Sequence, residues 1–426
     1  MAHHVNKKIY GNLIDRINRL PQGANPSQLL YQILEILFTK EEAQLISLLP
    51  IKPFSVQKAS QIWKMNLCKT QIKLDKLCDK ALLIDIEQNG KSVYVLPPPM
   101  AGFFEFSMMR IRKDIDQKLL SELFYQYLNV EKDFVKNLFT QGETQLGRVF
   151  VHEPALSSEV SLQVLDYERA SKVIKNATHR AVSMCYCRHK MHHIGKACNN
   201  PIDICMTFNI SAASLIKHKN ARSVDVEECM DLLQQAYDHK LVQFGDNVRE
   251  QVNFICNCCG CCCEALLAAK RFAIFNPVHT TNFIPEIDDQ SCNGCKKCVN
   301  ICPVEALHLI PKDISGNKQK NIATLNANLC LGCGICIRSC PNNALKLRHR
   351  ETKILTPLDS MHRVVVMAIE RGTLQDFIFD NRVLFSHRAM AAVLGVFFKL
   401  PLIKRILANR QLKSRYLEKL TKRIKY

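Results

Sequence analysis

Two segments in the C-terminal third of the chain repeat one cysteine pattern without a gap. The first is CNGCKKCVNICPVEALHL from Cys292, and the second is CLGCGICIRSCPNNALKL from Cys330. Both read C-x-G-C-x-x-C-x-x-x-C-P-x-x-A-L-x-L. Three cysteines at such short intervals let one tight loop surround three corners of a cube, and Gly294, Gly332 and Gly334 let the backbone approach closely. The repeat therefore predicts two similar loops that bind metal through thiolates.

The repeat resembles the ligand run of bacterial-type two-cluster ferredoxins, in which the fourth cysteine of each run ligates the other cluster. The resemblance implies two [4Fe–4S] clusters and one-electron transfer. The implied ligand sets are Cys292, Cys295, Cys298 and Cys340 for one cluster, and Cys330, Cys333, Cys336 and Cys302 for the other. A pair of zinc ribbons is the alternative, but zinc sites usually use two C-x-x-C hooks without a fourth cysteine followed by proline.

The spacer between the two halves is a polar stretch from Pro311 to Asn328. It is longer than the link in compact members of that family. We expect an exposed hairpin here, because such an insertion leaves the ligands undisturbed.

A second set of cysteines lies upstream of the repeat. The segment CYCRHKMHHIGKACNNPIDIC offers Cys185, Cys187, Cys198 and Cys205, which would hold a further [4Fe–4S] cluster, a structural zinc ion, or simply be buried thiols. The segment CNCCGCCC offers Cys256, Cys258, Cys259, Cys261, Cys262 and Cys263. Side chains of consecutive residues diverge, so only a subset of these six would ligate one metal, for example Cys256 and Cys259 with one or two of Cys261 to Cys263. Adjacent free thiols would alternatively support dithiol chemistry.

Composition narrows the setting of this chemistry. The chain of 426 residues has 21 cysteines, and all except Cys68 and Cys78 lie between Cys185 and Cys340. The N-terminus has no apolar segment typical of a secretory signal, so we expect a cytoplasmic protein whose cysteines bind metal, in an oxygen-poor cell. No apolar run is long enough to span a membrane. The net charge of +19 suggests an acidic partner, nucleic acid or an anionic membrane surface, without choosing among them.

The N-terminal part predicts helices followed by a hairpin. Helical spacing begins at Gln28, continues through Glu41 to Leu49, Ser55 to Lys64 and Thr70 to Lys80, and two β-rich runs then flank Asn89-Gly90. This order resembles a winged helix-turn-helix domain. Its last helix carries Lys69, Lys73, Lys76 and Lys80 on one face, which would contact DNA phosphates with Lys91 on the wing, or would simply be solvated.

We therefore expect an α+β multidomain fold. The predicted parts are a loose lead-in (1–28), a winged-helix-like domain (29–100), a helical linker region (101–180), a cysteine-rich metal-binding domain (181–282), a ferredoxin-like domain (283–350) and a helical basic tail (351–426). The tail mixes apolar residues such as Phe397 and Ile403 with Lys399 and Arg405, and it would either pack on the protein or contact an anionic membrane surface peripherally.

The sequence favours an iron–sulfur electron carrier or oxidoreductase subunit that serves a redox partner protein with an acidic docking face. It shows no Ser–His–Asp set, phosphate loop or G-x-G-x-x-G fingerprint, so we assign no catalytic residue and no cofactor other than metal. Two alternatives stay open. One is a redox-responsive DNA-binding regulator, and the other is an oxidoreductase with a substrate site in the CNCCGCCC region.

Overall fold

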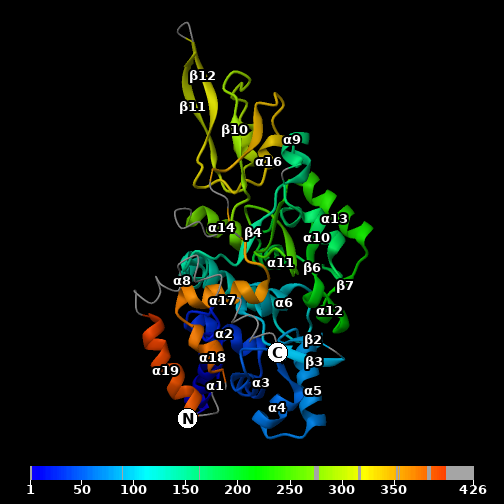
Figure 1. Ribbon diagram of the computed structural model, residues 1–426, viewed down its shortest axis with the longest axis vertical. Coiled ribbons are helices and arrows are strands. Elements are labelled where there is room, and N and C mark those ends of the chain that lie inside the picture. Colours follow the sequence, from blue (N-terminus) through cyan, green and yellow to red (C-terminus); the bar gives the residue numbers. More distant parts are fainter. Residues whose placement is uncertain are drawn as a thin grey trace. The chain divides into compact units, whose positions relative to one another are not determined.

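The chain forms two compact units. The computed structural model describes residues 2–399 apart from positions 89, 163, 273–277, 315–317, 352–353, 355 and 381–384 (Figure 1). The first unit comprises Met1–Thr144, Ile210–Arg222 and Asp359–Tyr426, and the second comprises Gln145–Asn209 and Ser223–Leu358. Both mix helices with strands, so the predicted α+β class is confirmed.

The first unit is mainly helical. Its elements are α1 (Ala2–Ile17), α2 (Gln28–Leu37), α3 (Lys40–Ser47), β1 (Phe54–Ser55), α4 (Val56–Trp63), α5 (Leu67–Asp79), β2 (Ile84–Gln88), β3 (Lys91–Val95), α6 (Phe104–Met108), α7 (Gln117–Tyr125), α8 (Asp133–Thr140), most of α12 (Asn209–Lys217), α17 (Ser360–Arg371), α18 (Leu374–Ile378) and α19 (Phe385–Lys399).

The prediction of a loose lead-in over residues 1–28 is wrong, because α1 is a helix with a buried face. Tyr10, Leu13, Ile14 and Ile17 follow helical spacing and are almost completely buried. The Arg16 guanidinium on the same helix is also buried and donates to the carbonyl oxygens of Leu49 and Pro50. These contacts fix α1 against the segment that follows α3.

The predicted helices and hairpin of residues 28–97 are present. Ser55 caps α4 by accepting a hydrogen bond from the Lys58 amide, as its position before an amphipathic stretch indicated. The hairpin pairs Gln88 with Lys91, and β3 lies between β1 and β2 in a three-stranded sheet. The turn position 89 lies outside the described residues.

The second unit contains the cysteine-rich segments. Its elements are β4 (Gly147–Val149), α9 (Ser158–Ser161), α10 (Ala170–Asn176), β5 (Arg180–Met184), α11 (Tyr186–His193), β6 (Asp203–Phe208), β7 (Arg222–Ser223, which starts at the boundary), α13 (Val226–Asp238), β8 (Val242–Asp246), β9 (Phe254–Cys258), α14 (Glu264–Arg271), β10 (Phe283–Ile287), α15 (Lys297–Ile301), β11 (Leu307–Ile314), β12 (Lys318–Leu325), α16 (Ile335–Arg338) and β13 (Leu345–His349). Strand β4 departs from the helical linker expected over residues 101–180, since it pairs with β8.

A six-stranded sheet with the order β4-β8-β9-β6-β5-β7 organises this unit. Ile255 of β9, Met206 of β6 and Val182 of β5 belong to one buried core with residues of α10 and α13. Successive side chains of a strand point to opposite faces. Cys205, Cys256 and Cys258 therefore lie on the face of the sheet that α10 and α13 leave open.

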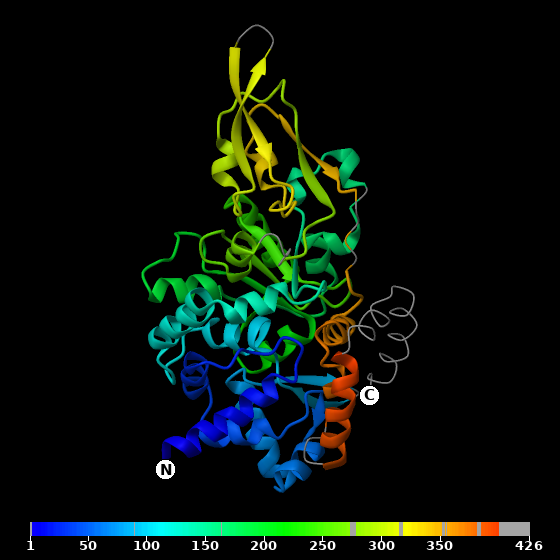
Figure 2. The ribbon, with the colours of Figure 1, turned by 90° about the vertical axis from the view of Figure 1, so that its left-hand side faces the viewer.

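The repeated cysteine segments fold as two similar halves. The short helix α15 of the first half corresponds to α16 of the second, and each follows a residue with a left-handed backbone, Lys296 and Gly334. Strand β10 pairs with β13, and β11 pairs with β12. The β11–β12 pair is the hairpin predicted for the polar spacer. Figure 2 shows its long strands beside the rest of the two repeated segments.

The C-terminal part contributes α17, α18 and α19 to the first unit. No helix in the described ranges is long and apolar enough to cross a membrane. The predicted basic tail from Leu400 onward, and the side chains of Phe397, Phe398 and Lys399, lie outside the residues whose placement is described.

Candidate metal centres

Each half of the repeat encloses a small cavity that is lined by four cysteines. The first cavity is lined by Cys292, Cys295, Cys298 and Cys340. The second is lined by Cys302, Cys330, Cys333 and Cys336. In both cases three cysteines come from one half and the fourth comes from the other half. The structure thus brings together the same two sets that the sequence resemblance implies.

Backbone geometry around both cavities suits a [4Fe–4S] cluster. Gly294 and Gly332 both have positive φ, and a side chain on either would collide with backbone atoms, those of Asn321 and Phe283 respectively. The crossing cysteines also match, since the Ala306 amide donates to Cys302 Sγ and the Ala344 amide donates to Cys340 Sγ. Such amide donors stabilise cluster thiolates.

These buried thiols become thiolates only where a cation compensates the charge. Burial raises the pKa of the Cys330 thiol, and it raises the pKa of Cys333 to about 12. Without metal these thiols would be neutral at ordinary pH. Metal ligation deprotonates a coordinating thiol outright and compensates its charge. The donor set therefore fits iron–sulfur clusters, which need four thiolates each.

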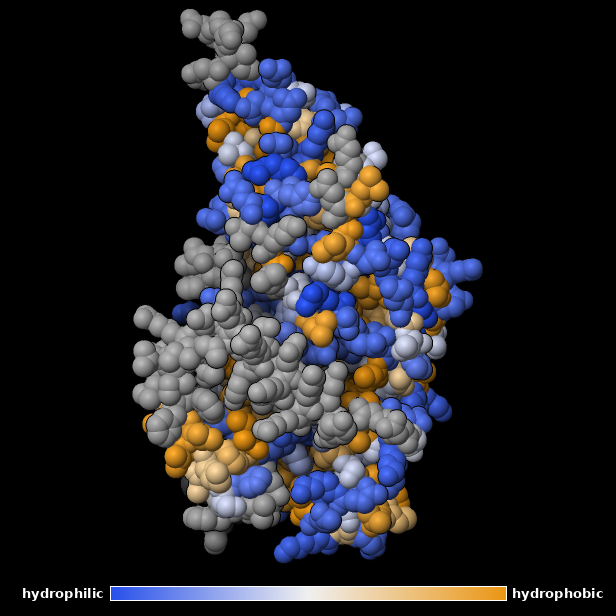
Figure 3. Space-filling model, in the orientation of Figure 1, coloured by the Kyte–Doolittle hydropathy of each residue, from blue (hydrophilic) through white to orange (hydrophobic). Residues whose placement is uncertain are grey.

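The two cavities differ in their exposure. Cys295 of the first cavity is exposed, and the adjacent Lys296 and Lys297 are exposed as well. Each set has two buried cysteines, Cys292 and Cys298 in the first and Cys330 and Cys336 in the second, so the sets differ in that the second has no exposed member. On the face seen in Figure 3, hydrophilic residues cover most of the surface around β11 and β12. The first cavity is thus the one nearer to solvent, beside two lysines.

The upstream cysteines divide into two groups. Six of them are neighbouring thiols that shift one another's pKa in a closed ring, and the ring members in order are Cys185, Cys187, Cys263, Cys258, Cys256 and Cys205. Strands β6 and β9 supply three members. Cys187 lies on α11 and Cys263 caps α14, so these two helices close the ring from the side away from the sheet.

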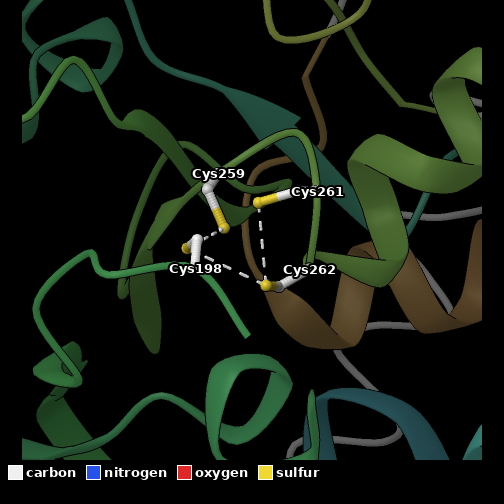
Figure 4. Close-up of side chains that lie close together, drawn as sticks. All are labelled: Cys198, Cys259, Cys261 and Cys262. Carbon is white, nitrogen blue, oxygen red and sulfur yellow. Dashed lines mark hydrogen bonds between the residues drawn. The ribbon is translucent and has the colours of Figure 1, made fainter. Parts of the chain in front are cut away.

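The other four, Cys198, Cys259, Cys261 and Cys262, form a compact tetrad (Figure 4). All four sulfur atoms lie within 4.8 Å of one another. Cys198 Sγ is 3.6 Å from Cys259 Sγ and 3.9 Å from Cys262 Sγ, and the Cys261 and Cys262 sulfurs are 3.7 Å apart. Three members come from the turn after β9, and Cys198 comes from the loop between α11 and β6.

This division differs from both groupings considered from the sequence. Cys198 lies with the CNCCGCCC residues, whereas its sequence neighbours Cys185, Cys187 and Cys205 belong to the ring. Cys256 belongs to the ring and Cys259 to the tetrad, so these two are not partners in one site. The consecutive Cys262 and Cys263 point into different groups, whereas the consecutive Cys261 and Cys262 converge on the tetrad, contrary to the expectation that neighbouring side chains diverge.

Buried charges of α11 surround the ring. Arg188 donates to the carbonyl oxygens of Pro201 and Asn257. Burial alone would lower the pKa of this guanidinium, but the neighbouring Cys185 and Cys259 raise it above the usual value. Lys190 and Glu264 form an ion pair that is almost completely buried and joins α11 to α14. This ion pair is not predicted from the sequence, because no motif contains both Lys190 and Glu264.

Helix α11 also carries His189, His192 and His193, and two of these histidines contact each other. His189 Nε2 lies 3.1 Å from His193 Nε2, which makes these two partners of each other. In the first unit, Cys78, Asp85 and His218 also lie close together. The Asp85 carboxylate already accepts a hydrogen bond from Ser214 and pairs with Lys217, so protein groups compensate its charge.

The lysines of α5 are also partly engaged within the protein. Lys73 pairs with Glu41, and Lys80 pairs with Glu42, so two of the four predicted phosphate contacts have acidic partners on α3. These pairs reduce the positive charge that the helix offers to an anionic ligand.

The second cavity and the tetrad are neighbours within the second unit. An added Cβ at Gly260 would lie 2.2 Å from the carbonyl oxygen of Pro303. Gly260 separates Cys259 from Cys261, and Pro303 follows the crossing ligand Cys302. Lys270 of α14 also pairs with Glu305 on the same loop. The CNCCGCCC turn is therefore packed against the chain that lines the second cavity.

Comparison with known families places a 4Fe-4S dicluster domain at residues 291–344. The domain implies two [4Fe–4S] clusters within a larger cysteine-rich protein. The comparison with curated proteins found no match, and the comparison with solved structures found none either. The family match does not extend to residues 29–100, so the winged-helix resemblance stays a prediction.

Proposed function

We propose that the protein relays single electrons through the two [4Fe–4S] clusters of its dicluster domain to a partner protein. The observation that carries the proposal is the pair of cysteine-lined cavities, each of which takes three cysteines from one half of the repeat and one from the other. When bound, the clusters supply reversible one-electron oxidation and reduction. The chain's own residues hold the clusters, donate amide hydrogen bonds to their thiolates and separate one cluster from solvent.

The exposed cysteine of the first site indicates where a partner would exchange electrons with the protein. The first site lies beside exposed Cys295, Lys296 and Lys297, so it is the site that a partner would approach. Lysines at this edge favour a partner with an acidic docking face, because complementary charge raises the rate of encounter. The second site has no exposed cysteine and adjoins the CNCCGCCC turn, so it would exchange electrons with the interior of the unit.

The six-thiol ring would hold a further redox centre in the proposed electron relay. Four of its members are buried and two, Cys187 and Cys256, are half-buried. They adjoin one another, and Arg188 offsets negative charge beside them. Four thiolates suffice for a cubane cluster, so two members of the ring would remain as hydrogen-bond donors or bind a larger cluster.

Metal analysis of anaerobically purified protein tests this function. We expect about eight irons with matching sulfide from two [4Fe–4S] clusters, and interacting S = 1/2 signals in the dithionite-reduced EPR spectrum. About twelve irons or more would support a cluster in the ring. Four irons or fewer would overturn the proposal, since at least one dicluster site would then be empty of iron.

The regulatory alternative has a distinct signature. A DNA-binding role would give affinity for duplex DNA that falls steeply with salt and changes with oxidation state. The helix order of residues 29–100 supports it, and the engagement of Lys73 and Lys80 with acidic residues weighs against it. A cytoplasmic location and membrane contact through the tail stay predictions.

A further inference from the structure

We propose that Cys198, Cys259, Cys261 and Cys262 bind a single zinc ion, at a site separate from the iron–sulfur clusters. Zinc sites with four cysteines are tetrahedral with a Zn–S length near 2.3 Å, which places neighbouring sulfurs about 3.8 Å apart. Three of the six sulfur separations in the tetrad are 3.6, 3.7 and 3.9 Å, and all six are within 4.8 Å. The thiols thus already have the spacing of ligands that share one ion.

The same spacing excludes a cubane cluster at the tetrad. In a [4Fe–4S] cluster each cysteine binds a different iron, so the whole cube stands between the four sulfurs. The dicluster cysteines instead line the walls of two separate cavities. In the tetrad the sulfurs contact one another directly, so only a single ion fits between them (Figure 4).

The surroundings are those of a structural metal site. Three ligands lie on one short turn, and the fourth, Cys198, comes from a separate loop, so an ion would tie the two segments together. The Asn200 side-chain amide donates to Cys198 Sγ over 3.3 Å, which orients this thiolate. Zinc binds such thiolates more tightly than Fe²⁺ does, which favours zinc over a single iron.

The consequence concerns the dicluster domain. The turn that holds three tetrad ligands also carries Gly260 against Pro303, next to Cys302. Because zinc has no redox chemistry, electrons would pass beside this site and not through it. The ion would fix the position of the second cluster relative to the sheet and the six-thiol ring.

Zinc and iron should be measured together on the full-length, anaerobically purified protein, and on its Cys198→Ser and Cys262→Ser variants. We expect one zinc per chain in the parent and its loss in both variants, with iron content unchanged. Cys68→Ser is the control, since Cys68 is exposed and lies in the other unit. Substitution with Co²⁺ should give the intense charge-transfer absorption of a tetrahedral thiolate site, and this absorption should be absent from the Cys262→Ser variant.

A milder substitution keeps the test decisive if these variants fold poorly. Cys261 is exposed, and zinc accepts imidazole in place of a thiolate. We therefore expect Cys261→His to keep its zinc, and Cys261→Ala to release zinc faster to a coloured chelator. Retention of zinc in Cys198→Ser, or iron in place of zinc with loss of iron in the variants, would overturn the proposal. A failure of the electron-relay function would instead show as low iron with normal zinc.

Discussion

Gly260 packs directly against the carbonyl oxygen of Pro303, so that a methyl group at this position would come to 2.2 Å from that oxygen. A backbone carbonyl cannot move aside as the end of a flexible side chain can. The contact joins the CNCCGCCC turn to the loop that begins at Cys302, and it requires glycine between two cysteines of the tetrad.

Gly260→Ala should therefore destabilise the second unit by about 1–3 kcal/mol, the usual range for overpacking. Thermal unfolding of the anaerobic protein would measure the loss, and EPR would report any change in the coupling between clusters. Gly11→Ala is a matched control, because its added methyl lies in helix α1 at an ordinary contact distance of 3.4 Å from the Tyr31 hydroxyl. Equal unfolding temperatures for Gly260→Ala and the parent would contradict this reading.

The crossing ligands make a second prediction. Cys340→Ser should impair the cluster bound by the first half of the repeat, and Cys302→Ser should impair the cluster bound by the second half, although each cysteine is adjacent in sequence to the opposite set. Each variant should retain one intact [4Fe–4S] cluster and lose the EPR signature of spin interaction. Cys229→Ser is the control, since Cys229 lies in the core of α13 and the sheet. An unchanged spin interaction in either variant would count against the crossed arrangement.

The edge of the first cluster site gives a third prediction, which is based on charge. Replacing exposed Lys296 and Lys297 together by Glu should slow oxidation of the reduced protein by an anionic dye such as ferricyanide. Oxidation by a cationic viologen should be unchanged or faster, and the contrast should shrink at high salt because screening shortens the range of these charges. A Lys118→Glu, Lys132→Glu double variant supplies the same charge change in the other unit. Equal effects of both double variants would place electron exchange elsewhere.

The sequence predicts the local features of this protein better than it predicts which distant cysteines come together in the fold. Ser55 before an apolar stretch and Asn-Gly between two β-rich runs each act within a few residues, and the structure has the helix cap and the hairpin there. The two cavity-lining sets follow from an internal repeat, which carries three of every four ligands within one loop. Those signals are short-range, so one sequence reveals them.

The upstream cysteines show where such reasoning stops. Cys198 is closer in sequence to Cys205 than to Cys259, yet the loop after α11 returns to the turn after β9 and brings Cys198 and Cys259 within 3.6 Å. That proximity depends on strand order in the sheet, which no local pattern encodes. Helix α1 was missed for another reason, since its polar residues lower the apolar content of a segment whose Leu13 and Ile17 are nevertheless buried.

The buried ion pair of Lys190 and Glu264 makes a fourth prediction. Both side chains are almost fully excluded from water, at 0% and 2% exposure. Removing one partner leaves an uncompensated charge in the interior, so Lys190→Met or Glu264→Leu alone should cost about 3–5 kcal/mol. The double variant should be clearly more stable than either single variant, because both charges then disappear. Denaturant unfolding of the four proteins gives the coupling energy, and additive effects would show that the two groups do not depend on each other.

The contact between His218 and two aspartates in the first unit predicts a dependence on pH. Contact of His218 Nε2 with the Asp85 carboxylate over 3.2 Å, together with the hydrogen bond between His218 Nδ1 and Asp79, raises the pKa of His218 above its usual value. A raised pKa means that the folded state holds the proton more tightly, so this contribution is fully present below the unfolded pKa and is lost as pH rises through the folded value. Lys217 and Asp85 keep their charges over this range, since the pKa of Lys217 is raised and that of Asp85 is lowered.

Hydrogen exchange can detect this loss locally, at the amides of β2 and α12, where the Asp85 amide donates to Ser214. Protection of these amides should be greater in the parent than in His218→Gln at pH 6, and the difference should shrink as the pH rises past the folded pKa. Comparison at each pH removes the intrinsic dependence of exchange on hydroxide. A difference that stays constant from pH 6 to pH 9 would mean that His218 acts by packing alone, because a neutral imidazole would then stabilise β2 and α12 as well as a charged one.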